Sequence, residues 1–249
     1  MARIKAEDKN SHQESLCNQL NRELTQLAQS QFETPEFEFF FSTPLSLERA
    51  RFFSTQLVLY GTNRRDCWAF VQARAPWEVK RVIWEHEKDE LYFDPRGGSD
   101  HRELMSKEAI SLGATAQEVA TTEPTPLLSA AHMAFIHLAE NLPWLGALTA
   151  SHFLERRNNS DLMVGGGFSQ RWRTKVVDEL GIDQKGLKSS NVHVEADVDH
   201  SVSIWGAIAA NVTDEESYNT AMRGAEACAV IDRAHRAGEA HGMRSIPIK

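Results

Sequence analysis

The stretch His193-Val-Glu-Ala-Asp-Val-Asp-His200 holds the residue types best suited to chemistry, two histidines and a central aspartate at helical spacing. Because each residue of a helix advances by about 100°, His193, Asp197 and His200 fall within an arc of roughly 60° on one face. Glu195 and Asp199 fall on the far side, where we expect solvent. Two imidazoles and one carboxylate form a ligand set that suits non-haem iron with open coordination positions. The alternative interpretation is an ordinary polar helix face.

A second acidic candidate lies on the helical segment 79–93. Its apolar stripe also passes through His86 and Glu90, whereas Glu87 and Asp89 point elsewhere, as a solvated face should. An ionised carboxylate buried alone is very costly, so Glu90 must be paired or bound to a metal. His86, one turn before Glu90, is a competing ligand. Its alternative is a hydrogen-bonded core histidine, which is the interpretation that we favour.

Three further candidates stand on other segments. Glu155 follows Trp144 and Leu148 on one helical stripe, and its alternative is a buried salt bridge to an arginine. Asp66 shares a stripe with apolar residues of an earlier helix, but a surface ion pair with a neighbouring arginine is the favoured interpretation. His101 follows the segment 79–93 across a proline–glycine break, which leaves its helical phase open.

Together these residues describe a possible binuclear metal site. Three carboxylates and three neutral imidazoles carry a charge of −3, close to balancing two ferrous ions. Carboxylates with imidazoles suit iron or manganese, and the lack of thiolates argues against structural zinc. No helix carries the Glu-x-x-His pattern of ferritin-like proteins convincingly. The predicted ligands are Glu90, His101, Glu155, His193, Asp197 and His200, with Asp66 as a further candidate.

The elements that must position these residues are predicted from apolar periodicity and from proline and glycine breaks. Helices are expected over about 46–75, 79–93, 127–140, 144–157, 169–180 and 192–212, with others around Leu16, from His101 and after Thr213. The aromatic stretch between Pro35 and Pro44 is expected to be an extended connector. About eight helices and no alternating strands predict an all-α bundle, a single domain over residues 1–249 with a frayed tail at 1–12.

Composition sets limits on partners and location. The 249 residues are 41% hydrophobic and 25% charged, as in ordinary soluble proteins, and the net charge of −8 argues against a nucleic-acid partner. No apolar run approaches the roughly 20 residues that a membrane helix needs, and the first residues lack a signal-peptide core. Cys17, Cys67 and Cys228 show neither a disulfide framework nor zinc spacing. We therefore expect a cytoplasmic protein with no membrane partner.

The order of the candidate ligands resembles that of the haem-oxygenase-like dimetal oxidases, a family of iron-containing redox enzymes. The matching segments are Trp84-Glu-His-Glu-Lys-Asp-Glu90, His101-Arg-Glu-Leu and His193-x3-Asp197-x2-His200, and the similarity spans about residues 50–208. The last motif is the most specific, whereas the match at Glu155 rests on helix register. Asp66 stands where several members have a glutamate that joins the site.

The resemblance implies a haem-oxygenase-like bundle of seven or eight helices that holds two irons, or a manganese–iron pair, and no haem. Known members activate O₂ for N-oxygenation, for oxidative cleavage of amino acids, or for decarboxylation of fatty acids. From this we expect O₂ as co-substrate, a small amino-acid-derived substrate in a biosynthetic pathway, and a homodimer. No flavin or nicotinamide motif is visible, so electrons would come from an external donor or from the substrate.

Other functions remain open from the sequence. They are a fatty-acid oxidative decarboxylase of the same family, a metal-free thiaminase-like or quinone-cofactor-synthase-like enzyme of the same fold, and a non-catalytic helical interaction protein. Cys67 points about 100° away from Asp66, which gives no strong case for a thiaminase-like nucleophile. An amino-acid pocket needs an inward basic residue, and the sequence does not rank Arg49, Arg51, Arg74 and Arg171 for that role.

Overall fold

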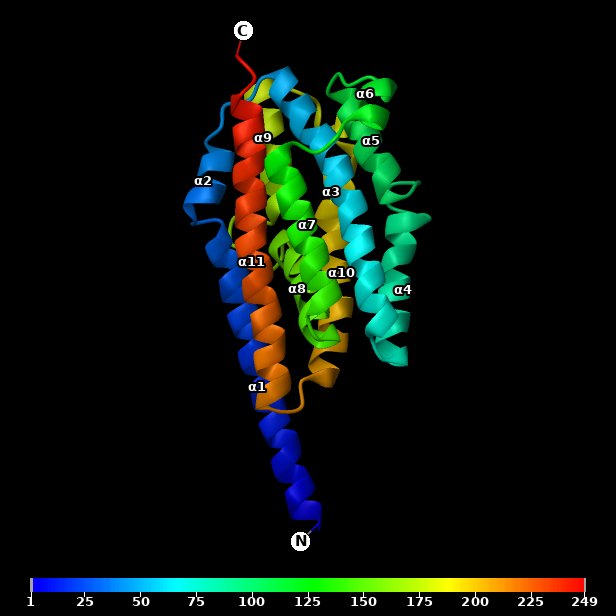
Figure 1. Cartoon of the computed structure of the whole chain (residues 1–249), viewed down its shortest axis with the longest axis vertical. Coiled ribbons are helices and arrows are strands. Elements are labelled where there is room, and N and C mark those ends of the chain that lie inside the picture. The colour runs from blue at the N-terminus through cyan, green and yellow to red at the C-terminus, as the bar shows by residue number, and fades with distance from the viewer. Residues whose placement is uncertain (1, 249) are drawn as a thin grey trace.

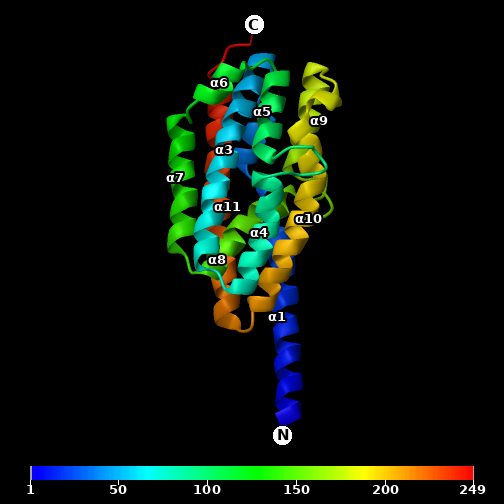
Figure 2. The ribbon, with the colours of Figure 1, turned by 90° about the vertical axis from the view of Figure 1, so that its right-hand side faces the viewer.

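The protein is an elongated bundle of α-helices in the computed structural model (Figure 1, Figure 2). The structure describes residues 2–248, with side chains over 13–248; the predicted frayed tail at 1–12 lies outside the described side chains. Residues 2–248 contain no strand, only an isolated bridge between Asp94 and Ser99. The helices are α1 (Ala2–Gln31), α2 (Pro35–Phe41), α3 (Leu47–Arg74), α4 (Trp77–Leu91), α5 (His101–Ser111), α6 (Ala116–Thr121), α7 (Pro126–Asn141), α8 (Trp144–Asn158), α9 (Phe168–Leu180), α10 (Lys188–Asn211) and α11 (Glu215–Arg244), with a 3₁₀ turn η1 (Gln184–Gly186) before α10.

Local signals explain where the helices that carry the site begin and end. The Asp100 side chain accepts a hydrogen bond from the backbone N–H of Glu103, which caps α5 directly before His101. The Ser46 side chain caps α3 in the same way, and Pro76 follows its last turn. Gly181, with φ of +64°, ends α9 in the left-handed conformation that glycine adopts readily. The all-α prediction and these boundaries are confirmed.

The sequence underestimated the number of helices, because the described chain has eleven rather than about eight. The stretch predicted to be an extended connector is helix α2, with Pro35 in its first turn, where a missing N–H costs nothing. Its Phe37 and Phe40, three residues apart, are fully buried on the same side. The short helix α6 was not predicted. The helix expected after Thr213 is α11, and its cap is Asp214, which forms a capping box with Ser217.

Helix α8 is the central element of the bundle. Every residue of 145–157 is buried, and α8 packs against α1, α3, α7, α10 and α11. It meets α11 at two glycines: a Cβ atom on Gly224 would lie 2.0 Å from the carbonyl oxygen of Gly146. The two helices therefore touch through their backbones, which fixes the position of α8 from one side.

The remaining wall of the site comes from α3, α4, α5 and α10, which pack against one another along the other side of α8 (Figure 1, Figure 2). An apolar core that includes Trp68, Leu148, Phe153 and Ile204 surrounds this region. None of the helices in the described chain has the length and apolarity to cross a bilayer.

Candidate metal centre

Helices α4, α5, α8 and α10 direct acidic and imidazole side chains into one region of the core. Five of the predicted ligands are buried and His193 is half-buried. Glu90 comes from α4, His101 is the first residue of α5, Glu155 lies on α8, and His193, Asp197 and His200 share one face of α10. Segments that are up to 110 residues apart in the sequence, as between Glu90 and His200, thus meet in space.

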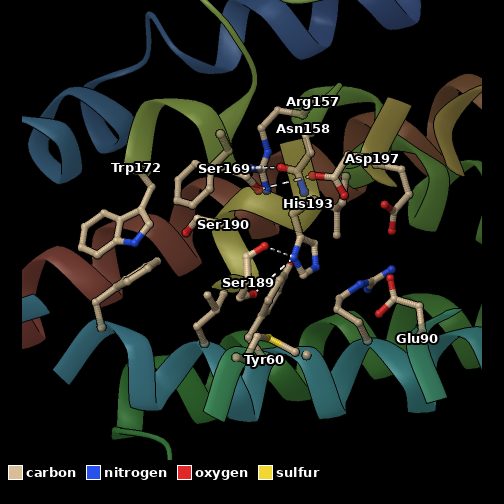
Figure 3. Close-up of a pocket in the computed structure, with 18 of the residues that line it drawn as sticks. Tyr60, Glu90, Arg157, Asn158, Ser169, Trp172, Ser189, Ser190, His193 and Asp197 are labelled. Atoms are coloured by element: carbon tan, nitrogen blue, oxygen red, sulfur yellow. Dashed lines mark hydrogen bonds between the residues drawn. The ribbon is translucent and has the colours of Figure 1, made fainter. Parts of the chain in front are cut away.

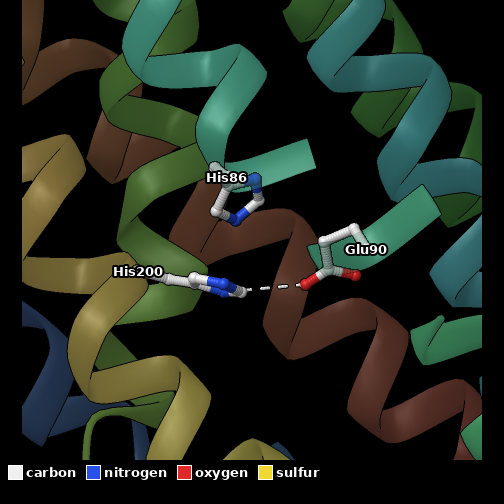
Figure 4. A group of neighbouring side chains, drawn as sticks. All are labelled: His86, Glu90 and His200. Atoms are coloured by element: carbon white, nitrogen blue, oxygen red, sulfur yellow. Dashed lines mark ion pairs between the residues drawn. The ribbon is translucent and has the colours of Figure 1, made fainter. Parts of the chain in front are cut away.

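Glu90 lies at the centre of these contacts. Its Oε1 atom is 3.0 Å from Nδ1 of His101 and 3.6 Å from Nδ1 of His200. Its other oxygen, Oε2, lies 3.1 Å from a guanidinium nitrogen of Arg65 on α3. Figure 4 shows Glu90 facing His200, with His86 one turn earlier on α4. The carboxylate thus presents one oxygen to imidazoles and the other to a cation of the protein.

The side chains form three groups, and within each group the potential ligand atoms all lie within 4.8 Å of one another. Two of them divide the six predicted ligands without overlap: Glu90, His101 and His193 form one, and Glu155, Asp197 and His200 form the other. The third consists of His86, Glu90 and His200 and joins the first two. The candidate ligands therefore form one continuous cluster with two neighbouring positions for a cation.

Ring nitrogens without a hydrogen bond indicate what this cluster can bind. The Nε2 atom of His86 and the Nδ1 atoms of His101 and His200 are buried and have no hydrogen-bond partner, although each faces a carboxylate. Nearly all buried polar atoms in proteins are hydrogen-bonded, so three such nitrogens directed at two carboxylates fit the donors of a metal site. Imidazole nitrogens with carboxylate oxygens are the donor set of iron or manganese. The residues therefore fit the metal pair that the sequence predicted.

The electrostatics of the protein without metal show strong coupling between acids and imidazoles. Burial opposes ionisation of Glu90, but Arg65 and then His101 hold the pKa of its carboxyl well below the ordinary value. Burial likewise opposes a charge on His101, but Glu90 and Asp94 raise its pKa to about 10. For His86, burial is outweighed by contacts with Glu155 and Glu87, which raise the pKa to about 9. Both imidazoles are therefore cationic at neutral pH when no metal competes for them.

The residues of α10 behave differently. Burial, together with the neighbouring His101, lowers the pKa of His193 to about 4. Burial and the charge of His86 also lower the pKa of His200. Burial and then the negative charges of Glu155 and Glu90 raise the pKa of Asp197 well above its ordinary value. Neutral imidazole is the form that binds a metal, so the two histidines of α10 are ready to coordinate at neutral pH.

Two aspartates that the sequence analysis did not single out as site residues orient the histidines from outside. The Nε2 atom of His101 lies 2.8 Å from Oδ2 of the fully buried Asp94, and Nε2 of His200 lies 3.4 Å from Oδ2 of Asp89. Arg96 binds both carboxylates, at 2.9 Å and 2.6 Å. Asp94 follows the end of α4, where helical phase no longer predicts direction. The helical stripe placed Asp89 on a solvated face. The sequence did not show that the turn after α4 brings Arg96 back to bind this carboxylate.

One prediction about the neighbouring acids was wrong. Glu87 was expected to be solvated but is buried, because it accepts hydrogen bonds from Arg65 at 2.7 Å and pairs with His86 at 3.0 Å. Glu195 is exposed, as its place on the far side of the helix predicted. Asp66 is also exposed and belongs to none of the three ligand groups found in the described chain. Its neighbour Arg65 reaches the site in its place, so α3 contributes a cation to the centre.

His86 combines both interpretations that the sequence allowed. Its ring packs between Trp68 and His200, with ring centroids 4.6 Å and 4.3 Å away. Its Nδ1 atom pairs with Glu87, as expected of a core histidine, while the free Nε2 lies 3.6 Å from Oε1 of Glu155. The ring is therefore held in place on one side and has one nitrogen directed toward the carboxylates of the site.

A cavity adjoins the cluster (Figure 3). Glu90, Glu155, His193 and Asp197 line one part of it, and Trp172 lies toward the other end. The rest of the lining mixes apolar side chains, such as Phe53, Leu57 and Phe168, with arginines, serines and Asn158. The predicted candidates Arg49, Arg51, Arg74 and Arg171 do not line this cavity, whereas Arg64, Arg65, Arg157 and Arg236 do.

Comparisons with known proteins agree with this architecture. A domain of unknown function with a heme oxygenase-like fold from Shewanella denitrificans superposes with a TM-score of 0.72 at 12% identity, over 92% of this chain and 93% of that one. A CADD-like protein of unknown function from Nostoc punctiforme gives 0.71 at 18% identity, over 91% and 97%. A TenA homologue from P. horikoshii gives 0.59 at 18% identity, over 89% and 99%. These similarities establish a haem-oxygenase-like fold. No curated protein matches the chain.

The fold and the carboxylate–histidine cluster thus define a haem-oxygenase-like protein with a candidate site for non-haem metal. The family model for iron-containing redox enzymes matches residues 51–233, which include every candidate ligand. The chain belongs to this family of iron-containing redox enzymes.

Proposed function

We propose that this protein is a non-haem diiron enzyme that uses O₂ to oxidise a small, amino-acid-derived substrate, by N-oxygenation or by oxidative C–C or C–N cleavage in a biosynthetic pathway. The observation that carries the proposal is the division of six buried or half-buried side chains into two adjacent ligand groups. Membership in the iron-containing redox enzymes supports iron as the metal, and a manganese–iron pair has the same ligand requirements.

Each side chain then has a definite role. Glu90, His101 and His193 would hold one ion, and Glu155, Asp197 and His200 would hold the second. Bound ferrous iron would supply electrons and open coordination positions for O₂. Asp94 and Asp89 keep the two imidazoles of His101 and His200 in the orientation that turns their Nδ1 atoms inward.

The surroundings of the centre favour chemistry away from water. The buried ring of Trp68 packs against His86, and residues 145–157 of α8, which are all buried, adjoin the centre. Arg65 compensates part of the negative charge of Glu90 and Glu87. We further propose a cytoplasmic homodimer that takes electrons from an external donor, such as a ferredoxin, or from the substrate itself. The free thiols of Cys17, Cys67 and Cys228 suit a reducing compartment.

Anaerobic loading with Fe(II), followed by counting of bound iron and mixing with O₂, tests the proposal. We expect about two irons per chain and a transient visible absorption band after mixing. His193→Ala and Asp197→Ala, one ligand from each group, should each lose at least one iron. His137→Ala changes an exposed histidine of α7 and is the matched control.

The same experiment separates the alternatives. A metal-free enzyme of this fold would retain no stoichiometric iron after loading. A non-catalytic interaction protein would show no Fe(II)-dependent O₂ uptake, and His193→Ala would leave its folding almost unchanged. A fatty-acid decarboxylase would load iron, but long-chain fatty acids rather than amino-acid-derived compounds would change the lifetime of the absorption band. Full iron content and O₂ consumption in His193→Ala would contradict the assignment of ligands.

A further inference from the structure

Arg64 on α3 is a buried cation without a partner. Only 6% of the residue is exposed, and its Nη2 atom has no hydrogen-bond acceptor. Among the buried arginines of residues 13–248, the other four each make hydrogen bonds or ion pairs. Arg49 donates to two backbone carbonyls, Arg156 to Thr25, Arg157 to Asp232 and Arg236 to Glu239. A buried charge without an ion-pair partner is unfavourable. Glu155 attracts Arg64 electrostatically but forms no ion pair with it, so the Nη2 donor is free to bind a ligand.

The location of Arg64 shows where such a partner would lie. Its side chain lines the cavity that also exposes Glu90, Glu155, His193 and Asp197. Tyr60, one helical turn earlier, lines the same wall, and its hydroxyl makes no hydrogen bond with the described residues. A guanidinium and a hydroxyl from successive turns of α3 therefore line the cavity that borders the candidate metal centre.

The other cations of the cavity are already engaged. Arg65 pairs with Glu87 and Glu90. Arg157 and Arg236 both contact the buried Asp232 on α11. The guanidinium of Arg64 instead lies over the ring of Phe135, 5.4 Å from its centroid, which orients it without neutralising it. It is thus the one guanidinium of this wall that a ligand can bind without displacing a protein carboxylate.

We propose that Arg64 binds a carboxylate group of the substrate, with Tyr60 as a second hydrogen-bond donor. A carboxylate matches the planar guanidinium through two parallel hydrogen bonds. A phosphate dianion would need more positive charge than a single unengaged arginine supplies. The apolar side chains Phe53, Leu57 and Trp172 of the same cavity would receive the hydrocarbon part of the ligand. That this ligand is oxidised rests on the proposed function, but its binding at Arg64 does not.

Calorimetric titration of the intact protein, as purified and again after metal removal, tests the inference with hexanoate and benzoate as probes. Their uncharged counterparts, hexanamide and benzamide, have nearly the same shape. We expect at least one carboxylate to bind saturably and its amide to bind at least about tenfold more weakly, because a hydrogen bond to a charged group is worth about 1.5–3 kcal/mol. Inorganic phosphate should bind more weakly than the carboxylate.

Substitutions then locate the interaction. Arg64→Met should weaken the carboxylate at least about tenfold and leave the affinity for the amide unchanged, and Arg64→Lys should retain an intermediate affinity. Arg81→Met, which removes an exposed arginine of α4, should have no effect. Because Arg64→Met removes an unpaired charge, its thermal midpoint without ligand should equal or exceed that of the unchanged protein.

Several outcomes would overturn the inference. They are equal affinities for carboxylate and amide, the absence of saturable binding by both carboxylates, tighter binding of phosphate, or unchanged carboxylate affinity in Arg64→Met. The comparison of carboxylate with amide uses the unchanged protein, so it decides the question even if a variant does not fold. If iron loading fails, the proposed function is contradicted, but carboxylate binding at Arg64 can still be measured. If iron loads normally and no carboxylate binds, only the role of Arg64 is contradicted.

Discussion

Asp94 lies 2.8 Å from the Nε2 atom of His101, and this contact turns the opposite ring nitrogen toward Glu90. The carboxylate of Asp94 is itself fixed by the side chain and the backbone N–H of Arg96. A carboxylate that holds the outer nitrogen of a histidine sets its tautomer and its orientation for metal binding. Asp94 lies in the turn between α4 and α5 and belongs to neither helix, yet it positions His101, a candidate ligand on α5.

This contact predicts the effect of Asp94→Asn. The variant keeps the size of the side chain but removes the charge that orients His101, so the affinity for Fe(II) should fall by about 10–100-fold. Competition with a chromophoric chelator measures the change. Asp199→Asn is the matched control, because Asp199 binds the same Arg96 at 2.7 Å from an exposed position and contacts no candidate ligand. Equal affinities in both variants would show that Asp94 does not orient the site.

The shifted pKa of His101 predicts how the metal-free protein responds to pH. Its pKa rises from 6.5 to about 10 on folding. A raised folded-state pKa adds stability that is complete below about pH 6.5 and is lost as the pH rises through 10. Urea midpoints measured from pH 6.5 to 10 should therefore decrease. The decrease should be shallower in His101→Gln than in the control His137→Gln, and parallel curves for the two variants would contradict the assignment.

The close contact between Gly224 and Gly146 predicts a large difference between two glycine substitutions. Gly224→Ala places a methyl group 2.0 Å from a backbone oxygen that cannot rotate away, so the free energy of unfolding should fall by at least about 1–3 kcal/mol. Gly206 lies on the exposed side of α10, and a Cβ atom added there would have no other atom within 4 Å. Gly206→Ala should therefore raise the free energy of unfolding by about 0.5–1 kcal/mol. Urea denaturation measures both, and similar values would show that α8 and α11 separate easily.

The exposure of Asp66 predicts that this residue is not required for the metal. Asp66→Ala should keep the same number of irons per chain, whereas Glu155→Ala should lose at least one, because Glu155 belongs to one of the two ligand groups. Elemental analysis after anaerobic loading decides between them. Loss of one iron in Asp66→Ala would show that α3 rearranges to bring this carboxylate inward when iron binds.

Much of the fold was predictable, because the long helices carry their signals locally. Ser46 and Asp100 cap α3 and α5 where these helices were predicted to begin, and Pro76 follows the end of α3. Helix α2 was missed because a seven-residue segment rich in phenylalanine has too few turns to show a period. Its packing partners come from other parts of the chain: the ring centroids of Phe53 and Phe168 each lie 5.4 Å from that of Phe40.

The site was predictable only where it follows helical phase. His193, Asp197 and His200 lie on one face of α10, as their spacing predicted, and the stripe on α4 placed Glu90 inward. Contacts set by turns and by neighbouring helices were not accessible. The roles of Asp94 and Arg96 depend on the turn between α4 and α5. The unpaired state of Arg64 depends on which acids lie opposite α3, and no spacing within one helix reveals that.

The backbone contact between α8 and α11 also determines which side of the centre can adapt. Glu155 projects from a helix that has no room to shift toward α11, since only main-chain atoms separate the two axes at Gly146. Glu90 is on α4 and His101 is on α5. Arg96, in the turn between these helices, binds Asp94 of the turn and Asp89 of α4. We expect a change in spacing between Glu155 and Glu90 during the catalytic cycle to arise from displacement of α4 and α5, with α8 as the stationary reference.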